Sequence, residues 1–297
     1  MLFEAVPNFS EGRDEGKISR ITERVRAVPG VRILDLHSDP DHNRSVLTFA
    51  GEEDAVLAGA VELARACATE LDLAAQTGEH PRVGVLDVLP FVPLDPATME
   101  DAVRLARRAG ELLGNLGFPV YLYGAAATAA HRRDLPDVRR GGYEGLASRA
   151  RDPGWRPDFG PAKLDPRGGA VAVGARPFLV AFNANLDTQD VQVARAIARE
   201  VRERDGGLPA VRALGLEVGG GAQVSMNLTD LGKTPIPVAL EAVRAAAARR
   251  GAAVESTELV GLAPLEAMLQ TARHYLSLRE LGAAHILEMG LRDDPGF

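Results

Sequence analysis

The chain has 297 residues, of which 46% are hydrophobic and 25% charged, as in a globular protein of one large or two ordinary domains. Its net charge of −7 argues against general nucleic-acid binding, and its single cysteine, Cys67, excludes an internal disulfide framework and a cysteine-rich zinc site. Because no apolar run is long enough for a membrane helix and the N-terminus lacks a secretory pattern, we expect a cytoplasmic protein with no membrane partner.

Hydrophobic periodicity predicts alternating strands and helices in the first half of the chain. In order, these are a strand at 2–9, a helix at 13–28, strands at 31–38 and 44–51, a helix at 53–74, a strand at 83–94, a helix at 99–117 and a strand at 119–124. Cys67 falls within the alanine-rich helix and is expected to be buried. Ser10 precedes the first helix, where we expect it to cap the helix. The free N–H groups of that helix end also suit an anion.

Residues 131–176 lack periodicity and are dense in glycine and proline, so they are predicted to form a long loop, which in compact domains is often functional. The second half then gives a strand at 177–187, a helix at 188–207, strands at 211–221 and 222–231, a helix at 235–251, a strand at 252–262 and a helix at 263–278. Both halves contain the order β-α-β-β-α-β. We therefore predict an α/β (α+β) fold of two ferredoxin-like subdomains, residues 1–177 and 178–297, with a ligand cleft between them.

Besides the strand-to-helix junction that holds Asn8 and Ser10, three segments could carry chemistry. In "GEHPR", His80 lies in an expected exposed turn, and the local sequence leaves open whether it transfers protons or only completes the turn. The segment "HSDPDHNRS" could supply metal ligands, but its spacing matches no known zinc or calcium loop, which favours a polar hairpin turn; those ligands would be His37, Asp39, Asp41 and His42. The segment "GPAKLDPRGG" lacks the order of a Walker loop and could be either a ligand loop or a solvent loop.

Eight segments follow one another in one order over residues 2–275: "VPNFSEGRD", "DHNRSVLTFAG", "GEHPRVGVLDVLPFVPL", "FPVYLYG", "DFGP", "GARPFLVAFNANL", "QVSMNLTDL" and "LVGLAPLEAML". In this order they resemble glutamate formimidoyltransferase, the formiminotransferase part of formimidoyltransferase-cyclodeaminase. The resemblance implies a homodimeric one-carbon transferase of histidine degradation. Its reaction moves the formimino group of N-formimino-L-glutamate to N5 of tetrahydrofolate, a co-substrate expected in the cleft, and it requires no metal.

The resemblance also implies roles for particular residues. His80 matches the catalytic histidine of the family, acting as base and then as acid. The folate-contacting loop of the family matches Gly160, Pro161, Ala162, Lys163, Leu164, Asp165, Pro166, Arg167, Gly168 and Gly169. The middle of this loop differs from the animal enzymes, and His37 stands where they have aspartate. Either Glu79 or a residue of the 37–45 turn could orient His80.

Both proposed substrates are polyanions, which arginine binds through its two-pronged guanidinium group. Arg44 and Arg82 are the first candidates for binding carboxylates, and Asn8, at the first strand-to-helix junction, is a further substrate-binding candidate. The remaining basic candidates are Arg132, Arg133, Lys163 and Arg167. Two alternatives stay open: a glutamate formyltransferase that uses N-formylglutamate, and a non-catalytic folate-binding protein, against which the intact "GEHPR" argues.

Overall fold

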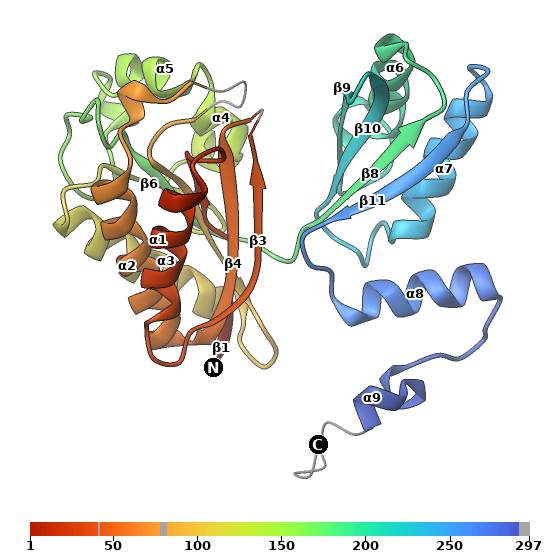
Figure 1. Cartoon of the computed structure of the whole chain (residues 1–297), viewed down its shortest axis with the longest axis horizontal. Coiled ribbons are helices and arrows are strands. Elements are labelled where there is room, and N and C mark those ends of the chain that lie inside the picture. The colour runs from red at the N-terminus through yellow and green to blue at the C-terminus, as the bar shows by residue number, and fades with distance from the viewer. Residues whose placement is uncertain (41, 78–81, 291–297) are drawn as a thin grey trace. The chain divides into compact units, whose positions relative to one another are not determined.

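The computed structural model describes residues 1–40, 42–77 and 82–290. The chain divides into two compact units, Met1–Pro177 and Phe178–Phe297, and each has a hydrophobic core of its own (Figure 1). In the described part of the chain, no helix is both long enough and apolar enough to cross a membrane.

The first unit is built on one seven-stranded sheet in the order β3-β4-β1/β2-β5-β7-β6. Its strands are β1 (Leu2–Ala5), β2 (Asn8–Phe9), β3 (Arg32–Asp39), β4 (Arg44–Glu52), β5 (Leu86–Pro93), β6 (Val120–Gly124) and β7 (Val171–Ala175). The predicted strand at 2–9 is interrupted at Val6 and Pro7, since proline has no N–H group for the ladder. Neighbours are antiparallel except that β7 runs parallel to both β5 and β6.

Three helices cover one face of this sheet: α1 (Glu15–Arg26), α2 (Glu53–Glu70) and α3 (Met99–Asn115). Alternate strand residues such as Phe9, Leu47, Phe49 and Leu89 pack against them and are fully buried. On the opposite face, which we call the second face, α4 (Leu135–Arg139) and α5 (Gly142–Arg149) contribute to a smaller apolar cluster that includes Val88, Tyr121, Val138 and Leu146.

The expectation of a structureless loop over 131–176 is wrong. The segment contains α4, α5 and β7, and β7 lies in the interior of the sheet between β5 and β6. Its sequence "VAVGA" is a short apolar run beside glycines, and every residue of it is buried. A parallel strand buried on both faces shows no alternation of polar and apolar residues, so periodicity gave no sign of it.

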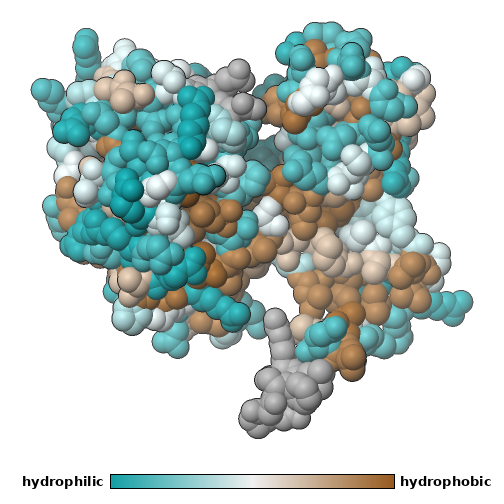
Figure 2. Space-filling view, in the orientation of Figure 1, coloured by the Kyte–Doolittle hydropathy of each residue, from teal (hydrophilic) through white to brown (hydrophobic). Residues whose placement is uncertain are grey.

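The second unit has a four-stranded antiparallel sheet in the order β11-β8-β10-β9. Its elements are β8 (Val180–Leu186), α6 (Val191–Val201), β9 (Val211–Val218), β10 (Gly221–Leu228), α7 (Ile236–Ala248), β11 (Val254–Val260), α8 (Leu265–Leu276) and α9 (Leu287–Gly290). Both units contain the predicted β-α-β-β-α-β order, so the fold class is confirmed. Figure 2 shows hydrophobic residues at the surface near α8, where Leu265, Met268 and Leu276 are exposed.

Candidate functional site

Segments that carry predicted site residues meet at one end of the first sheet. Within β2, Asn8 pairs with Val46 of β4 on one side and Val88 of β5 on the other. The N–H group of Ser10 then donates to the carbonyl of Val85 at 2.8 Å. Residues 8–13, the start of β4 and residues 83–88 are therefore neighbours, although they are far apart in sequence.

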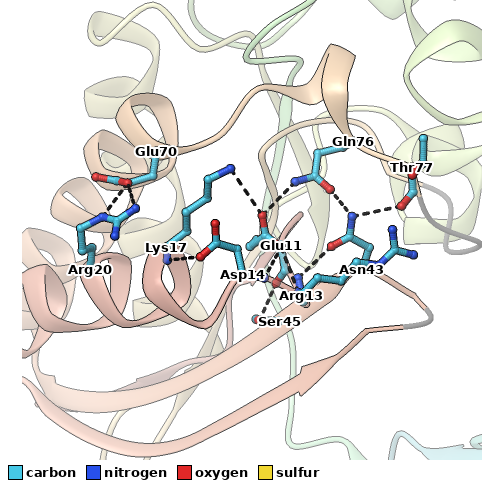
Figure 3. Close-up of polar contacts among 11 residues, drawn as sticks. Glu11, Arg13, Asp14, Lys17, Arg20, Asn43, Ser45, Glu70, Gln76 and Thr77 are labelled. Carbon is cyan, nitrogen blue, oxygen red and sulfur yellow. Dashed lines mark hydrogen bonds and ion pairs between the residues drawn. The ribbon is translucent and has the colours of Figure 1, made fainter.

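A chain of buried polar contacts, the Glu11 network (Glu11, Asn43 and Gln76), ties this end together (Figure 3). Glu11 accepts the N–H groups of Arg13 at 2.9 Å and Asp14 at 3.0 Å through one oxygen, and its other oxygen accepts Gln76 Nε2 at 3.3 Å. These bonds fix the turn before α1 against the segment that follows α2. A buried carboxylate is tolerated here because backbone and amide donors satisfy it.

Asn43 links the turn between β3 and β4 to the same network. Its Oδ1 accepts the N–H group of Gly12 at 2.9 Å, and its Nδ2 donates to Gln76 Oε1 and to the carbonyl of Thr77 at 3.0 Å. Its backbone is left-handed, with φ of 48°, a region that asparagine tolerates better than most residues. Asn43 thus fixes the chain as far as Thr77.

The predicted catalytic residue, His80, lies outside the described residues, as does Glu79, one candidate to orient it. The residues on either side are described. Arg82 Nη2 donates to the carbonyl of Gln76 at 2.6 Å, so the two described ends of this segment are joined by a hydrogen bond. Arg82 is one of the predicted carboxylate-binding residues, and one of its nitrogens is therefore engaged by the protein. Its buried Nε has no hydrogen-bond partner in the described part of the chain.

The expectation that Ser10 caps α1 is wrong. The cap is Asp14, whose carboxylate accepts the N–H group of Lys17 at 3.0 Å. Ser10 is buried, and its hydroxyl donates to the carbonyl of Gly84 at 2.8 Å. Residues 10–13 continue through the Glu11 network before the helix starts, so serine lies too early to reach the free N–H groups. It holds the start of the 83–88 segment instead.

On the second face, a group that we call the Asp87 cluster contains Asp87, Arg139 and Arg44. Asp87 is almost fully buried; one oxygen accepts the N–H group of Val83 at 2.8 Å, and the other accepts Arg139 Nη2. Burial, and secondarily the charge of Arg139, lower the pKa of Arg44, whereas Asp87 and Asp39 act in the opposite direction. Arg139 thus pairs directly with this buried carboxylate, and the charges of both residues act on Arg44.

The predicted folate loop, residues 160–169, contacts this region through its backbone. The N–H group of Val85 donates to the carbonyl of Gly168 at 3.0 Å, and that of Leu73 donates to the carbonyl of Arg167 at 2.8 Å. At Gly169, whose φ is 72°, a Cβ atom would lie 2.3 Å from the carbonyl oxygen of Val83, so only glycine allows this approach.

The side chains of the loop divide by role. Asp165 accepts the N–H groups of Arg167 at 3.2 Å and Gly168 at 3.1 Å and so closes the turn on itself. Lys163 and Arg167 are exposed, and Arg167 Nε also pairs with Asp72 at 3.1 Å. A pocket of about 330 Å³ borders Arg167 and the Glu11 network, and one of about 190 Å³ borders Asp165, Gly168 and Phe118.

The other candidates are distributed more widely. Arg132 is buried and forms an ion pair with the partly buried Asp158 at 2.8 Å, and Arg133 is exposed. His37 is exposed on β3, opposite Val46. His42 Nδ1 lies 2.6 Å from Asp39 Oδ2 in the turn between β3 and β4, and the candidate ligand Asp41 lies outside the described residues.

The prediction that Cys67 is buried is confirmed, and burial raises the pKa of its thiol. Among the residues that the structure describes, no three potential metal ligands of the histidine, cysteine, aspartate or glutamate type come together.

Residues 2–176 match the family described as "Formiminotransferase domain, N-terminal subdomain", and residues 181–288 match "Formiminotransferase domain". The chain belongs to the formiminotransferase family. The two matched regions correspond closely to the two compact units.

Relatives match over nearly the whole chain. It is 44% identical to glutamate formimidoyltransferase of Thermoplasma acidophilum over 97% of this chain and 96% of the relative. The corresponding enzyme of Streptococcus pyogenes is 38% identical, with 94% of each chain covered. Formimidoyltransferase-cyclodeaminase of Sus scrofa is 42% identical over 94% of this chain but only 53% of its own length.

Sequence reasoning did not identify the residues that organise this site, namely Glu11, Asn43, Gln76, Asp87 and Arg139. For two of these residues the sequence contains a feature that could have indicated the role. Asn43 occupies a turn, where asparagine often adopts a left-handed conformation. Asp87 interrupts the apolar run "VGVLDVLPF", where a carboxylate needs a buried partner. Arg139 gave no comparable sign, because its partner is 52 residues away.

Proposed function

We propose that this chain transfers the formimino group of N-formimino-L-glutamate to N5 of tetrahydrofolate, giving 5-formimino-tetrahydrofolate and L-glutamate. The observation that carries the proposal is the 44% identity, over almost the full length of both chains, to a protein named glutamate formimidoyltransferase. The family resemblance further suggests that the enzyme acts in histidine degradation, as a homodimer in the cytoplasm.

In this reaction N5 of tetrahydrofolate attacks the formimino carbon, and a tetrahedral adduct forms. The attacking nitrogen loses a proton and the departing glutamate nitrogen gains one. We assign both transfers to His80, first as base and then as acid, a contribution of roughly 10²- to 10⁴-fold. Binding the two substrates together supplies a further part of the rate, because it replaces a collision in solution by a reaction within one complex.

We assign the carboxylates of the donor to Arg44 and Arg82, with Asn8 as a neutral hydrogen-bonding partner. The register that makes Asn8 a neighbour of β4 and β5 supports this grouping. Tetrahydrofolate is assigned to residues 160–169. The exposed Lys163 and Arg167 of this loop suit the carboxylates of its glutamyl tail, since a fixed cation binds carboxylate well at a surface.

The direct test is to mix the protein with tetrahydrofolate and N-formimino-L-glutamate and to quantify both 5-formimino-tetrahydrofolate and released L-glutamate by mass spectrometry. The two products are expected in equal amounts. N-formyl-L-glutamate serves as the matched donor, because an oxygen replaces its imino nitrogen. Faster turnover of the formyl donor would favour the glutamate formyltransferase alternative, whereas tight folate binding without transfer from either donor would favour a non-catalytic binding protein.

His80→Ala tests the assigned base. Turnover is expected to fall by roughly 10²- to 10⁴-fold, because the proton transfers lose their catalyst, while tetrahydrofolate affinity measured by calorimetry stays within about twofold. His274→Ala, at a histidine in α8 of the second unit, is the control and should retain full turnover. Normal turnover of the His80 variant would refute the assignment.

A further inference from the structure

Glu4 of β1 is a buried carboxylate on the second face of the first sheet. Its neighbours Phe3 and Ala5 pack in the core beneath the helices, and because side chains alternate along a strand, Glu4 is directed to the second face. The residue is 8% exposed, yet its side chain forms no hydrogen bond or ion pair with any residue in the ranges 1–40, 42–77 and 82–290. Buried carboxylates are normally satisfied by donors, so Glu4 suits a donor that these residues do not supply.

The strand register places a cation on the other side of β5. Glu4 pairs with Val92 of β5, and the N–H group of Arg176, the residue after β7, donates to the carbonyl of Phe91 at 3.1 Å. Ala175 packs in the core beneath the helices, so Arg176 is directed to the second face. Glu4 and Arg176 thus flank β5 on one face, about two strand spacings or roughly 10 Å apart, with the fully buried Val92 between them.

The electrostatics agree with this placement. Burial raises the pKa of the Glu4 carboxyl, and the charge of Arg176 lowers it. Arg176 Nη1 donates to the carbonyl of Pro177 at 3.0 Å, which anchors the guanidinium without a carboxylate partner. The Glu4 oxygens are not among the enclosed polar atoms that lack a hydrogen bond in the described part of the chain, so they border open space.

The pair therefore presents an acceptor and a donor, side by side, above an apolar floor. A planar group with two adjacent N–H donors followed by a carbonyl oxygen matches this pattern. The 2-amino-4-oxopyrimidine edge of tetrahydrofolate carries such a set, namely its 2-amino group, N3–H and O4. The formimino group of the donor substrate has N–H donors only, and its carboxylates are assigned to other arginines.

The position along the sheet also fits the pyrimidine edge. Glu4 pairs with Ala50 and Val92, whereas Asn8 pairs with Val46 and Val88, so the two residues are four positions or about 13 Å apart along one line of the sheet. A bicyclic ring held at its edge by Glu4 would extend toward Asn8.

We propose that Glu4 and Arg176 bind the pyrimidine edge of tetrahydrofolate, with Glu4 accepting from the 2-amino group and N3 and Arg176 donating to O4. The identity of the ligand rests on the proposed function. N5 then lies on the side of Asn8, and the glutamyl tail extends toward residues 160–169, which meet the sheet where Gly169 bridges to Gly84.

The test compares tetrahydrofolate with an analogue in which a methyl group replaces the 2-amino group. Both dissociation constants are measured by anaerobic calorimetry. The wild-type chain should bind tetrahydrofolate roughly 10- to 100-fold more tightly, since the analogue lacks a charge-assisted hydrogen bond. Glu4→Gln should weaken tetrahydrofolate binding by a similar factor and bind the two ligands within about threefold of each other. Arg176→Gln should weaken both ligands equally, by roughly 5- to 10-fold, because both carry O4.

Glu52→Gln is the matched control. Glu52 lies opposite Leu2 at the end of the neighbouring strand β4 and is exposed, so both affinities should stay within about twofold of the wild-type values. Stability separates binding from a structural role. Because Glu4→Gln replaces a buried charge by a neutral amide, its Tm should be unchanged or higher. The comparison of the two ligands on the wild-type chain needs no variant, so it decides the matter even if Glu4→Gln does not fold.

The kinetic measurement is the KM of each substrate. For Glu4→Gln, the KM of tetrahydrofolate should rise by at least about 10-fold, while that of N-formimino-L-glutamate stays within about twofold. Equal binding of the two ligands by the wild-type chain would overturn the inference, as would an undiminished preference in Glu4→Gln or a rise confined to the KM of N-formimino-L-glutamate. If the wild-type chain transfers no formimino group but prefers tetrahydrofolate through Glu4, the proposed function fails and the inference stands. Formimino transfer without this preference has the reverse meaning.

Discussion

At the scale of single residues, Asn43 combines an unusual backbone conformation with three hydrogen-bonding partners. Asparagine tolerates its left-handed φ of 48°. In this conformation the side-chain amide forms hydrogen bonds with Gly12, Gln76 and Thr77. The hydrogen bonds to Gly12 and Gln76 are buried, and the one to Thr77 is partly buried. Removing the amide would therefore leave several of them without a hydrogen bond at once.

We expect Asn43→Ala to lower the free energy of unfolding by about 2–4 kcal/mol, because each buried group left unpaired costs about 1–3 kcal/mol. Asn43→Gly removes the same hydrogen bonds but relaxes the left-handed backbone, so it should be about 1 kcal/mol more stable than the alanine variant. Urea denaturation followed by fluorescence of Trp155, the only tryptophan, measures both values in the first unit. An alanine variant as stable as the wild type would contradict the role given to this network.

At the scale of elements, α3 shows how a local sequence defines a helix start. Thr98 Oγ1 accepts the N–H group of Asp101 at 3.3 Å, and the carboxylate of Asp101 accepts the N–H group of Thr98 at 2.8 Å and its hydroxyl at 2.6 Å. This reciprocal arrangement is a capping box. The hydrogen bonds from Thr98, followed by that from Arg104, lower the pKa of Asp101 from 3.8 to about 2.

This pKa has a defined consequence for stability. A carboxylate whose pKa is lower in the folded state contributes stability that is fully present above its unfolded pKa and is lost as the pH falls through the folded value. For Asp101 that window runs from the ordinary value of 3.8 down to about 2. We therefore expect the Tm difference between the wild type and Asp101→Asn to be largest above about pH 5 and to shrink toward pH 2.

Calorimetric scans at a series of pH values measure this difference. Thr98→Ala is the companion variant. It removes the hydroxyl that contributes most to the lowered pKa, and at neutral pH it should cost about 1 kcal/mol, as is usual for the loss of a helix cap. A Tm difference that stayed constant from pH 5 to pH 2 would show that the Asp101 carboxylate does not titrate as described.

At the scale of the whole molecule, the apolar clusters of the two units do not share a residue. The first unit contains all the described members of the Glu11 network and the Asp87 cluster, as well as residues 160–169. Its sheet is completed by β7, which ends two residues before the boundary with the second unit. The first unit thus has a sheet and apolar clusters of its own.

We therefore expect a fragment of residues 1–177 to fold cooperatively on its own, with one sigmoidal urea transition in Trp155 fluorescence. Leu89→Ala in the same fragment, at a fully buried core position, should lower its free energy of unfolding by about 2–5 kcal/mol. A fragment without a cooperative transition would show that the second unit is needed to complete the core. Fragment 1–174, which cuts into β7, is the matched control and should be markedly less stable.

The sequence by itself determined the order of the main elements outside residues 131–176 and pointed to the segments that carry the candidate site residues. Long amphipathic helices and alternating strands follow from local periodicity, which acts over a few residues, and "GEHPR" and "DHNRS" belong to the segments that carry the family resemblance. Their order along the chain was enough to indicate the family.

Only the tertiary structure decided which residues within these segments touch one another. It inserted β7 between β5 and β6, assigned the cap of α1 to Asp14 in place of Ser10, and joined Asp87 to Arg139. Each of these outcomes depends on a hydrogen bond or ion pair between residues that are distant in sequence, or on competition between nearby polar side chains for the same backbone groups. Neither leaves a periodic pattern, because the favourable partner is determined only when the sheet has formed and water has been excluded.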